Sequence, residues 1–143
     1  MKNLTMRWMI AAAALAVAVG SASAQTYKAE IPMSFRAGDK VMEPGVYEFS
    51  VTMKGGGQSI LTVRNKETNR MALLMPRQGD DPSVAWRKAG SAVLSFECYG
   101  RSCTLHQLWD GHTPYTYEFH GPKVPAAEMA SRSLVTVSLG AVD

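Results

Sequence analysis

Apolar and polar residues alternate along most of the chain, which is the pattern of β-strands that bury one face. In the first such segment, Ile31, Met33 and Phe35 alternate with other residue types. The alternating segments are 31–36, 47–53, 61–64, 92–98, 103–109, 114–120 and 134–139, with a more continuous apolar run at 71–75. We expect an antiparallel all-β fold of about eight strands, a sandwich or a partly closed barrel, because such sheets must cover one face.

The segments between the predicted strands carry turn and loop residues. Residues 55–57, 65–69 and 110–111 predict tight connections, and residues 78–90 predict the longest loop. Residues 125–132 have room for one or two helical turns, since Pro125 suits an early helical position. A loop is the alternative there, because so short a segment is marginal for a helix. The chain is therefore expected to hold at most one short helix.

The first 24 residues have the three parts of a secretory signal peptide. Lys2 and Arg7 supply positive charge, residues 8–19 form an apolar run, and Ala22 and Ala24 suit a signal peptidase. An uncleaved membrane anchor is the alternative, but a spanning helix needs about 20 apolar residues. We expect cleavage before Gln25 and one β domain over residues 25–143, periplasmic or secreted, with no further transmembrane segment.

Composition and charge exclude two classes of protein. Hydrophobic residues make up 46% of the chain and charged residues 19%, which excludes a disordered or fibrous chain. The formal net charge is +3, from 15 Lys and Arg against 12 Asp and Glu. Removal of Lys2 and Arg7 with the leader leaves 13 against 12, or +1. A nucleic-acid-binding protein usually has a strongly positive surface, and a net charge of +1 does not provide one. Nucleic acid is therefore not expected as a partner.

The two cysteines lie at the ends of two alternating segments, with four residues between them. In a hairpin with a four-residue loop, Cys98 and Cys103 face each other across the closing pair, and Phe96 opposes Leu105. Export supplies oxidising conditions, so we predict an intramolecular Cys98–Cys103 disulfide. A loop this short stabilises the fold by only about 2 kcal/mol.

Sequence motifs of catalysis and metal binding are missing. The chain has no G-x-S-x-G elbow, no phosphate-binding glycine loop before a helix and no H-E-x-x-H. A redox-active cysteine pair usually has two intervening residues, and a zinc site needs further ligands at matching spacing. The histidines, which are spread over two predicted strands and a turn, are His106, His112 and His120. We expect no catalytic residue, no metal and no cofactor.

An aromatic group near the ends of two predicted strands is the candidate binding surface. It comprises Trp109, Tyr115 and Tyr117, whose rings can contact a peptide, a glycan or a hydrophobic molecule. The favoured interpretation is structural, because Tyr115, Tyr117 and Phe119 share one strand face and can form core and cross-strand pairs.

Two blocks of sequence carry a family pattern. The first block contains Pro32, Phe35, Gly38, Lys40, Pro44, Gly45 and Tyr47. The second contains Leu94, Phe96, Tyr99, Gly100, Leu105 and Trp109. Together they resemble a family of small uncharacterised exported bacterial proteins, a resemblance that implies export and an all-β fold and brings no activity. Cys98 and Cys103 stand where that family more often has other residues, as an added disulfide would require.

The expected function is a binding or structural role in the cell envelope without catalysis. The motivating features are the leader, the strand pattern and the missing catalytic motifs. The partner is left open between an envelope protein and a small hydrophobic ligand. The alternative is a carrier that holds a small hydrophobic ligand in a cavity between the strands. The aromatic residues would line such a cavity together with four methionines, Met42, Met53, Met71 and Met75.

Overall fold

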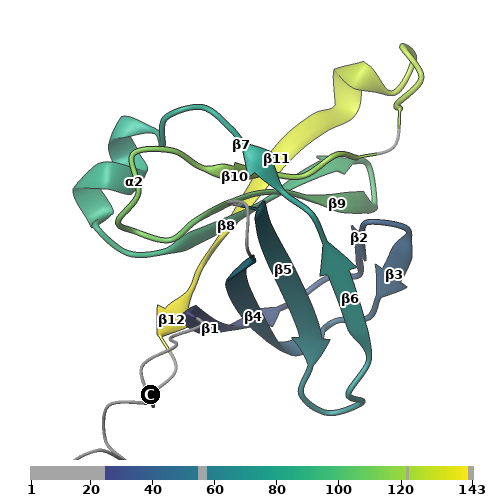
Figure 1. The fold of residues 1–143 in the computed structure, drawn as a ribbon. Coiled ribbons are helices and arrows are strands. Elements are labelled where there is room, and N and C mark those ends of the chain that lie inside the picture. Colours follow the sequence, from purple (N-terminus) through teal and green to yellow (C-terminus); the bar gives the residue numbers. More distant parts are fainter. Residues whose placement is uncertain (1–24, 55–57, 122, 142–143) are drawn as a thin grey trace, which may run out of the picture.

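The computed structural model describes residues 25–54, 58–121 and 123–141, so the predicted signal peptide and the predicted turn at 55–57 lie outside the described residues. Twelve strands in the described residues form two sheets packed face to face (Figure 1). This arrangement confirms the predicted all-β fold. Within the described residues both sheets end in border strands and no closed barrel forms, which is consistent with the predicted sandwich.

The first sheet has the order β12-β1-β4-β5-β6, and every neighbouring pair is antiparallel. Its strands are β1 (Gln25–Ile31), β4 (Gly45–Lys54), β5 (Gln58–Asn65), β6 (Met71–Leu74) and β12 (Gly140–Ala141). One face buries Tyr47, Phe49, Leu61 and Val63, which are at most 1% exposed. These residues occupy the apolar positions of the alternating pattern, so the register follows from the sequence.

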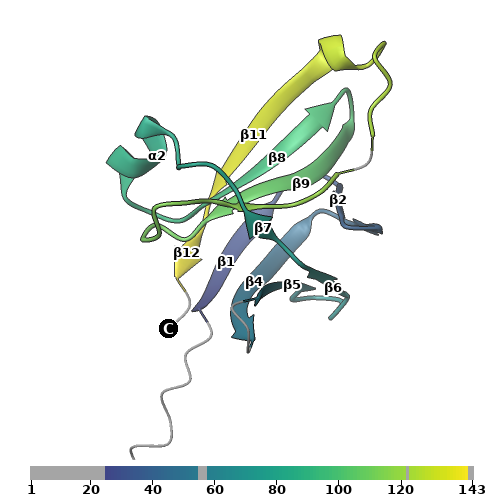
Figure 2. The ribbon, with the colours of Figure 1, turned by 45° about the horizontal axis from the view of Figure 1, so that its top comes forward.

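The second sheet has the order β11-β8-β9-β10-β7, and Figure 2 shows β11, β8 and β9 side by side. Its strands are β7 (Arg77–Gln78), β8 (Val93–Tyr99), β9 (Ser102–Trp109), β10 (Tyr117–Glu118) and β11 (Arg132–Ser138). A hairpin of β2 (Phe35–Ala37) and β3 (Lys40–Met42) joins this sheet through one parallel pair, Arg36 with Thr104. The hairpin is therefore attached more by its buried side chains than by backbone pairing.

Three aromatic rings join the two sheets and the β2–β3 hairpin at the centre of the core. Phe35 meets Tyr47 at a centroid distance of 5.1 Å and Phe96 at 5.2 Å, both edge to face. All three side chains are at most 1% exposed. Rings in this geometry attract each other beyond the burial of their area, so Phe35 anchors β2.

Two predicted strands differ from the structure. The predicted strand at 31–36 is interrupted at residues 32–34, between β1 and β2. Pro32 has no amide hydrogen to donate there, which favours a break. The predicted strand at 114–120 shrinks to β10, because the Asp110 carboxylate accepts hydrogen bonds from the amides of His112 and Thr113 and holds residues 110–113 in a turn.

The predicted loop at 78–90 contains a helix, α2 (Val84–Ala89). The Trp86 amide donates to the Ser83 hydroxyl at 3.2 Å, and Gly90 ends the helix with φ 70°. Six residues are too few to show a helical period, so only the capping residues mark this helix in the sequence.

The predicted helical turns or loop at 125–132 contain a short 3-10 helix, η1 (Met129–Ser131). No helix in the described part of the chain has the length and apolar character that a membrane span requires.

Candidate functional site

The disulfide hairpin of β8 and β9 forms one wall of the candidate site. The structure confirms the predicted disulfide, with Cys98 opposite Cys103 in the strand register. Phe96 lies opposite Leu105, which was also predicted. The cross-link therefore fixes the register at the tip of the hairpin.

The tip is tighter than the sequence suggested. Tyr99 pairs with Ser102, so Gly100 and Arg101 alone form the connection instead of the four predicted residues. Gly100 has φ 62°, a left-handed conformation that glycine adopts without steric cost and that two-residue hairpins favour. This short turn holds Arg101 at the exposed end of the hairpin.

A groove of about 370 Å³ lies between this hairpin, the β2–β3 hairpin and residues 123–128. Its apolar lining comes from Phe35, Val41, Val124, Pro125 and Cys103. Phe35 is buried, whereas Val41 is 52% exposed. Small-molecule sites commonly have 300–1,000 Å³ and a mostly apolar lining, and the groove has both properties.

Positive charge predominates along the groove. Arg36, Arg101 and Lys123 line it, with Glu128 as the one acidic residue among the lining residues. Among the described residues, these three cations form no ion pair with a carboxylate. A guanidinium presents a planar set of donors that matches carboxylate and phosphate. The groove is therefore suited to a ligand with one anionic group and an apolar part.

A hydrogen-bonded cluster beside the groove pairs the carboxylate of Glu97 with groups of its own surroundings. Glu97 accepts hydrogen bonds from the Tyr99 hydroxyl and, at 3.1 Å, from the Arg132 guanidinium. His106 Nδ1 lies 3.7 Å from Glu97 Oε2. Burial works to raise the pKa of Glu97, but the hydrogen bonds from Tyr99 and Arg132 and the charge of His106 outweigh it, so the pKa is lowered. Because Arg132 pairs with Glu97, this carboxylate does not cancel the groove cations.

Replacing Glu97 with glutamine is expected to lower the free energy of unfolding by about 1 kcal/mol at pH 7. The folded pKa lies below the unfolded value, so the stabilisation is present above about pH 4.3 and is lost as pH falls through the folded pKa. Urea unfolding of Glu97→Gln and wild type should converge in acid. The exposed Glu30→Gln is the control, and a Glu97→Gln deficit that persists unchanged in acid would contradict this assignment.

The predicted aromatic group is split between the two faces of the second sheet. Tyr117 pairs with Leu108 across β10 and β9, so its ring lies on the opposite face from the adjacent Trp109. Trp109 is 4% exposed, and its indole nitrogen donates to the Thr113 carbonyl at 2.8 Å. Tyr115 and Tyr117 meet edge to face at 5.7 Å. The structure therefore brings together two of the three predicted residues.

Tyr115 and Tyr117 line a second hollow, of about 410 Å³. Its other lining residues are Met53, Gln58, Ser59, Pro76, Arg77 and Gln78. Burial, with smaller contributions from Tyr115 and Asp110, raises the pKa of Tyr117 to about 12, so its hydroxyl stays protonated near neutral pH. This lining is mostly polar and suits a hydrophobic ligand less well than the groove does.

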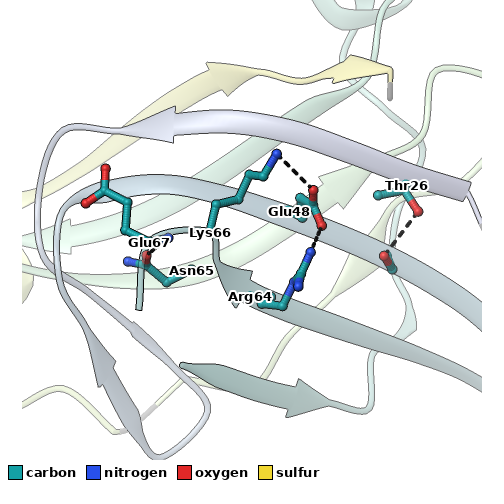
Figure 3. Close-up of polar contacts among 7 residues, drawn as sticks. Thr26, Glu48, Arg64, Asn65, Lys66 and Glu67 are labelled. Atoms are coloured by element: carbon teal, nitrogen blue, oxygen red, sulfur yellow. Dashed lines mark hydrogen bonds and ion pairs between the residues drawn. The ribbon is translucent and has the colours of Figure 1, made fainter. Parts of the chain in front are cut away.

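A charged cluster on the outer face of the first sheet is satisfied internally (Figure 3). Arg64 and Lys66 both pair with Glu48, the latter at 3.3 Å, and their hydrogen bonds hold the pKa of Glu48 below its usual range. The Asn65 side chain accepts the amide hydrogens of Glu67 and Thr68 and shapes the turn after β5. These contacts hold neighbouring strands and a turn in place, so the cluster has a structural role.

No protein-family model, curated protein or solved structure matches this chain. The resemblance to the exported family therefore stays a prediction. Within the described residues, no group of three His, Cys, Asp or Glu side chains is placed to hold a metal ion.

Sequence reasoning missed the groove because its charged residues are far apart in the chain. Arg36, Arg101 and Lys123 come from β2, the β8–β9 turn and the segment before η1. The single parallel pair between β2 and β9 brings the first two together. Such non-local pairing has no local sequence signal.

Proposed function

We propose that the protein is an exported, non-catalytic binding module of the cell envelope. Its groove beside the disulfide hairpin binds a ligand that has one anionic group, a carboxylate or a phosphate, attached to an apolar part. The observation that carries the proposal is the set of three cations without carboxylate partners, among the described residues, over an apolar lining. The predicted leader and the disulfide support export.

A carrier of a neutral hydrophobic ligand has less support. The four methionines that would line its cavity are dispersed: Met42 is fully buried in the core, whereas Met53, Met71 and Met75 are 63%, 43% and 65% exposed. The apolar area of the groove is open along a charged rim. A hydrophobic tail can lie there while its headgroup contacts the arginines.

Calorimetric titration with three probes tests the proposal. Octyl phosphate has both the anionic and the apolar part, whereas octanol lacks the charge and inorganic phosphate lacks the chain. We expect octyl phosphate to bind most tightly and its affinity to fall as salt screens the rim charges. Equal binding of octanol would favour the neutral-ligand carrier, and no binding of octyl phosphate would refute the proposal.

Removing two of the rim charges should weaken this binding. The variant Arg36→Gln/Arg101→Gln is expected to raise the dissociation constant of octyl phosphate about tenfold, which is about 1.4 kcal/mol for two exposed charge contacts. The matched control is Arg70→Gln/Arg87→Gln, which removes two exposed arginines outside the groove lining. If both double variants weaken binding equally, the effect is net charge alone and the groove is not the site.

A further inference from the structure

The border strands of the two sheets differ in how open they are to another strand. β12 and β7 have two residues each, β3 has three, and β6 has four. On β6, the Lys40 ammonium donates to the Met71 carbonyl at 2.8 Å, so the edge is partly occupied. β11 has seven residues, with no proline and no lysine. Short strands, lysines and prolines are the usual protection against edge pairing, and β11 lacks all three.

One edge of β11 pairs with β8 along its whole length, and within the described residues no strand pairs with the other edge. Figure 2 shows β11 at the border of the sheet, beside β8. Leu134 is 55% exposed on the outer face of this strand, and Val135 and Val137 are half-buried on the inner face. The border therefore combines free backbone groups with incompletely covered apolar side chains.

We propose that the protein is a homodimer in which β11 pairs antiparallel with β11 of a second copy, about a two-fold axis near Val135. Full overlap of the strands places Val135 opposite the partner's Val135 and Leu134 opposite the partner's Thr136. Leu134 then lies diagonal to the partner's Leu134 on the same face, within reach of a long side chain. In this register the two exposed leucines cover each other.

The charges of β11 are compatible with a second copy. Arg132 is the one charged residue of the strand, and it pairs with Glu97 of its own chain. In this register Arg132 and the Arg132 of the second copy lie six residues apart along the paired strands, or about 20 Å. That distance exceeds the screening length of about 8 Å at physiological salt. In a two-fold symmetric dimer the same surface of each copy meets itself, so the strand must not bring like charges together. β11 meets this condition.

The dimer interface and the groove lie on different sides of the hairpin. The order of the sheet puts β8 and β9 between β11 and the β2 strand that lines the groove. Pairing at β11 thus gives a dimer with two grooves, which can bind a multivalent surface more tightly than one chain can. The dimer stands or falls independently of the groove ligand.

Sedimentation velocity over a concentration series tests the dimer, using protein expressed as the full chain and purified from the periplasm. Wild type should reach the mass of two chains, and Leu134→Lys should remain at the mass of one, because like charges then meet across the axis. Leu73→Lys, at a 70% exposed position on β6, is the control and should dimerise as wild type does.

Thr136→Lys is a second variant at the same interface, and it should also remain at the mass of one chain. It is included in case Leu134→Lys does not fold. Circular dichroism establishes whether each variant is folded. In wild type, amide exchange of β11 should slow at concentrations where the dimer forms. A wild type with the mass of one chain throughout would overturn the proposal. A folded Leu134→Lys or Thr136→Lys variant that dimerises normally would overturn it as well.

Discussion

Replacing Phe35 with alanine is expected to lower the free energy of unfolding by about 3–5 kcal/mol. Phe35 is 1% exposed and contacts Tyr47 of the first sheet and Phe96 of the second. Its loss leaves a cavity between the two sheets and removes the main anchor of the β2–β3 hairpin. Domains of this size have only about 5–15 kcal/mol of stability in total, so the variant should be close to unfolding.

Urea unfolding followed by circular dichroism measures this effect. The matched control is Leu73→Ala, which truncates a 70% exposed side chain and should change stability by no more than about 0.5 kcal/mol. We also expect the Phe35→Ala variant to lose octyl phosphate binding, because β2 supplies Arg36 to the groove. A Phe35→Ala stability close to that of Leu73→Ala would show that the three-ring contact does not hold the hairpin.

Removal of the disulfide is expected to have the second largest effect, a loss of about 2 kcal/mol in the Cys98→Ala/Cys103→Ala variant. The cross-link closes a short loop whose register the β8–β9 pairs already specify, so the fold should be retained. Wild type unfolded in the presence of a reductant is the matched comparison, since it lacks the bond and keeps both side chains.

The two disulfide-free forms should unfold at similar urea concentrations. Truncating buried Cys98 adds a small further loss in the alanine variant, because that side chain is 3% exposed. Mass spectrometry with and without reduction before alkylation establishes that the bond is present in the starting protein. A loss larger than that of Phe35→Ala would mean that the bond, and not the core, holds the sandwich together.

The sequence predicted the parts of the fold that depend on local periodicity and on direct pairing. The alternation around Phe49 and Val63 identified the buried face of β4 and β5, and the spacing of Cys98 and Cys103 identified a cross-linked hairpin. Both follow from the two-residue period of a strand, which a single sequence displays.

The remaining features depend on contacts that no local pattern reveals. α2 was missed because its six residues are defined by the caps Ser83 and Gly90 and not by a period. The strand predicted at 114–120 was too long because the Asp110 carboxylate holds a turn in front of it. The aromatic group was divided because Trp109 and Tyr117 lie on opposite faces of the sheet. The groove could not be predicted because it forms where β2 pairs with β9, and these strands are far apart in the sequence.

The most direct test of the binding proposal is to locate bound octyl phosphate by amide chemical-shift mapping in solution. We predict that the shifts concentrate on Arg36, Arg101 and Lys123 and on their neighbours in β2 and β9. The Arg36→Gln/Arg101→Gln variant should show the same pattern only at higher ligand concentration. Shifts centred on the hollow at Tyr115 and Tyr117, or no shifts at saturating ligand, would contradict the assignment of the groove as the binding site.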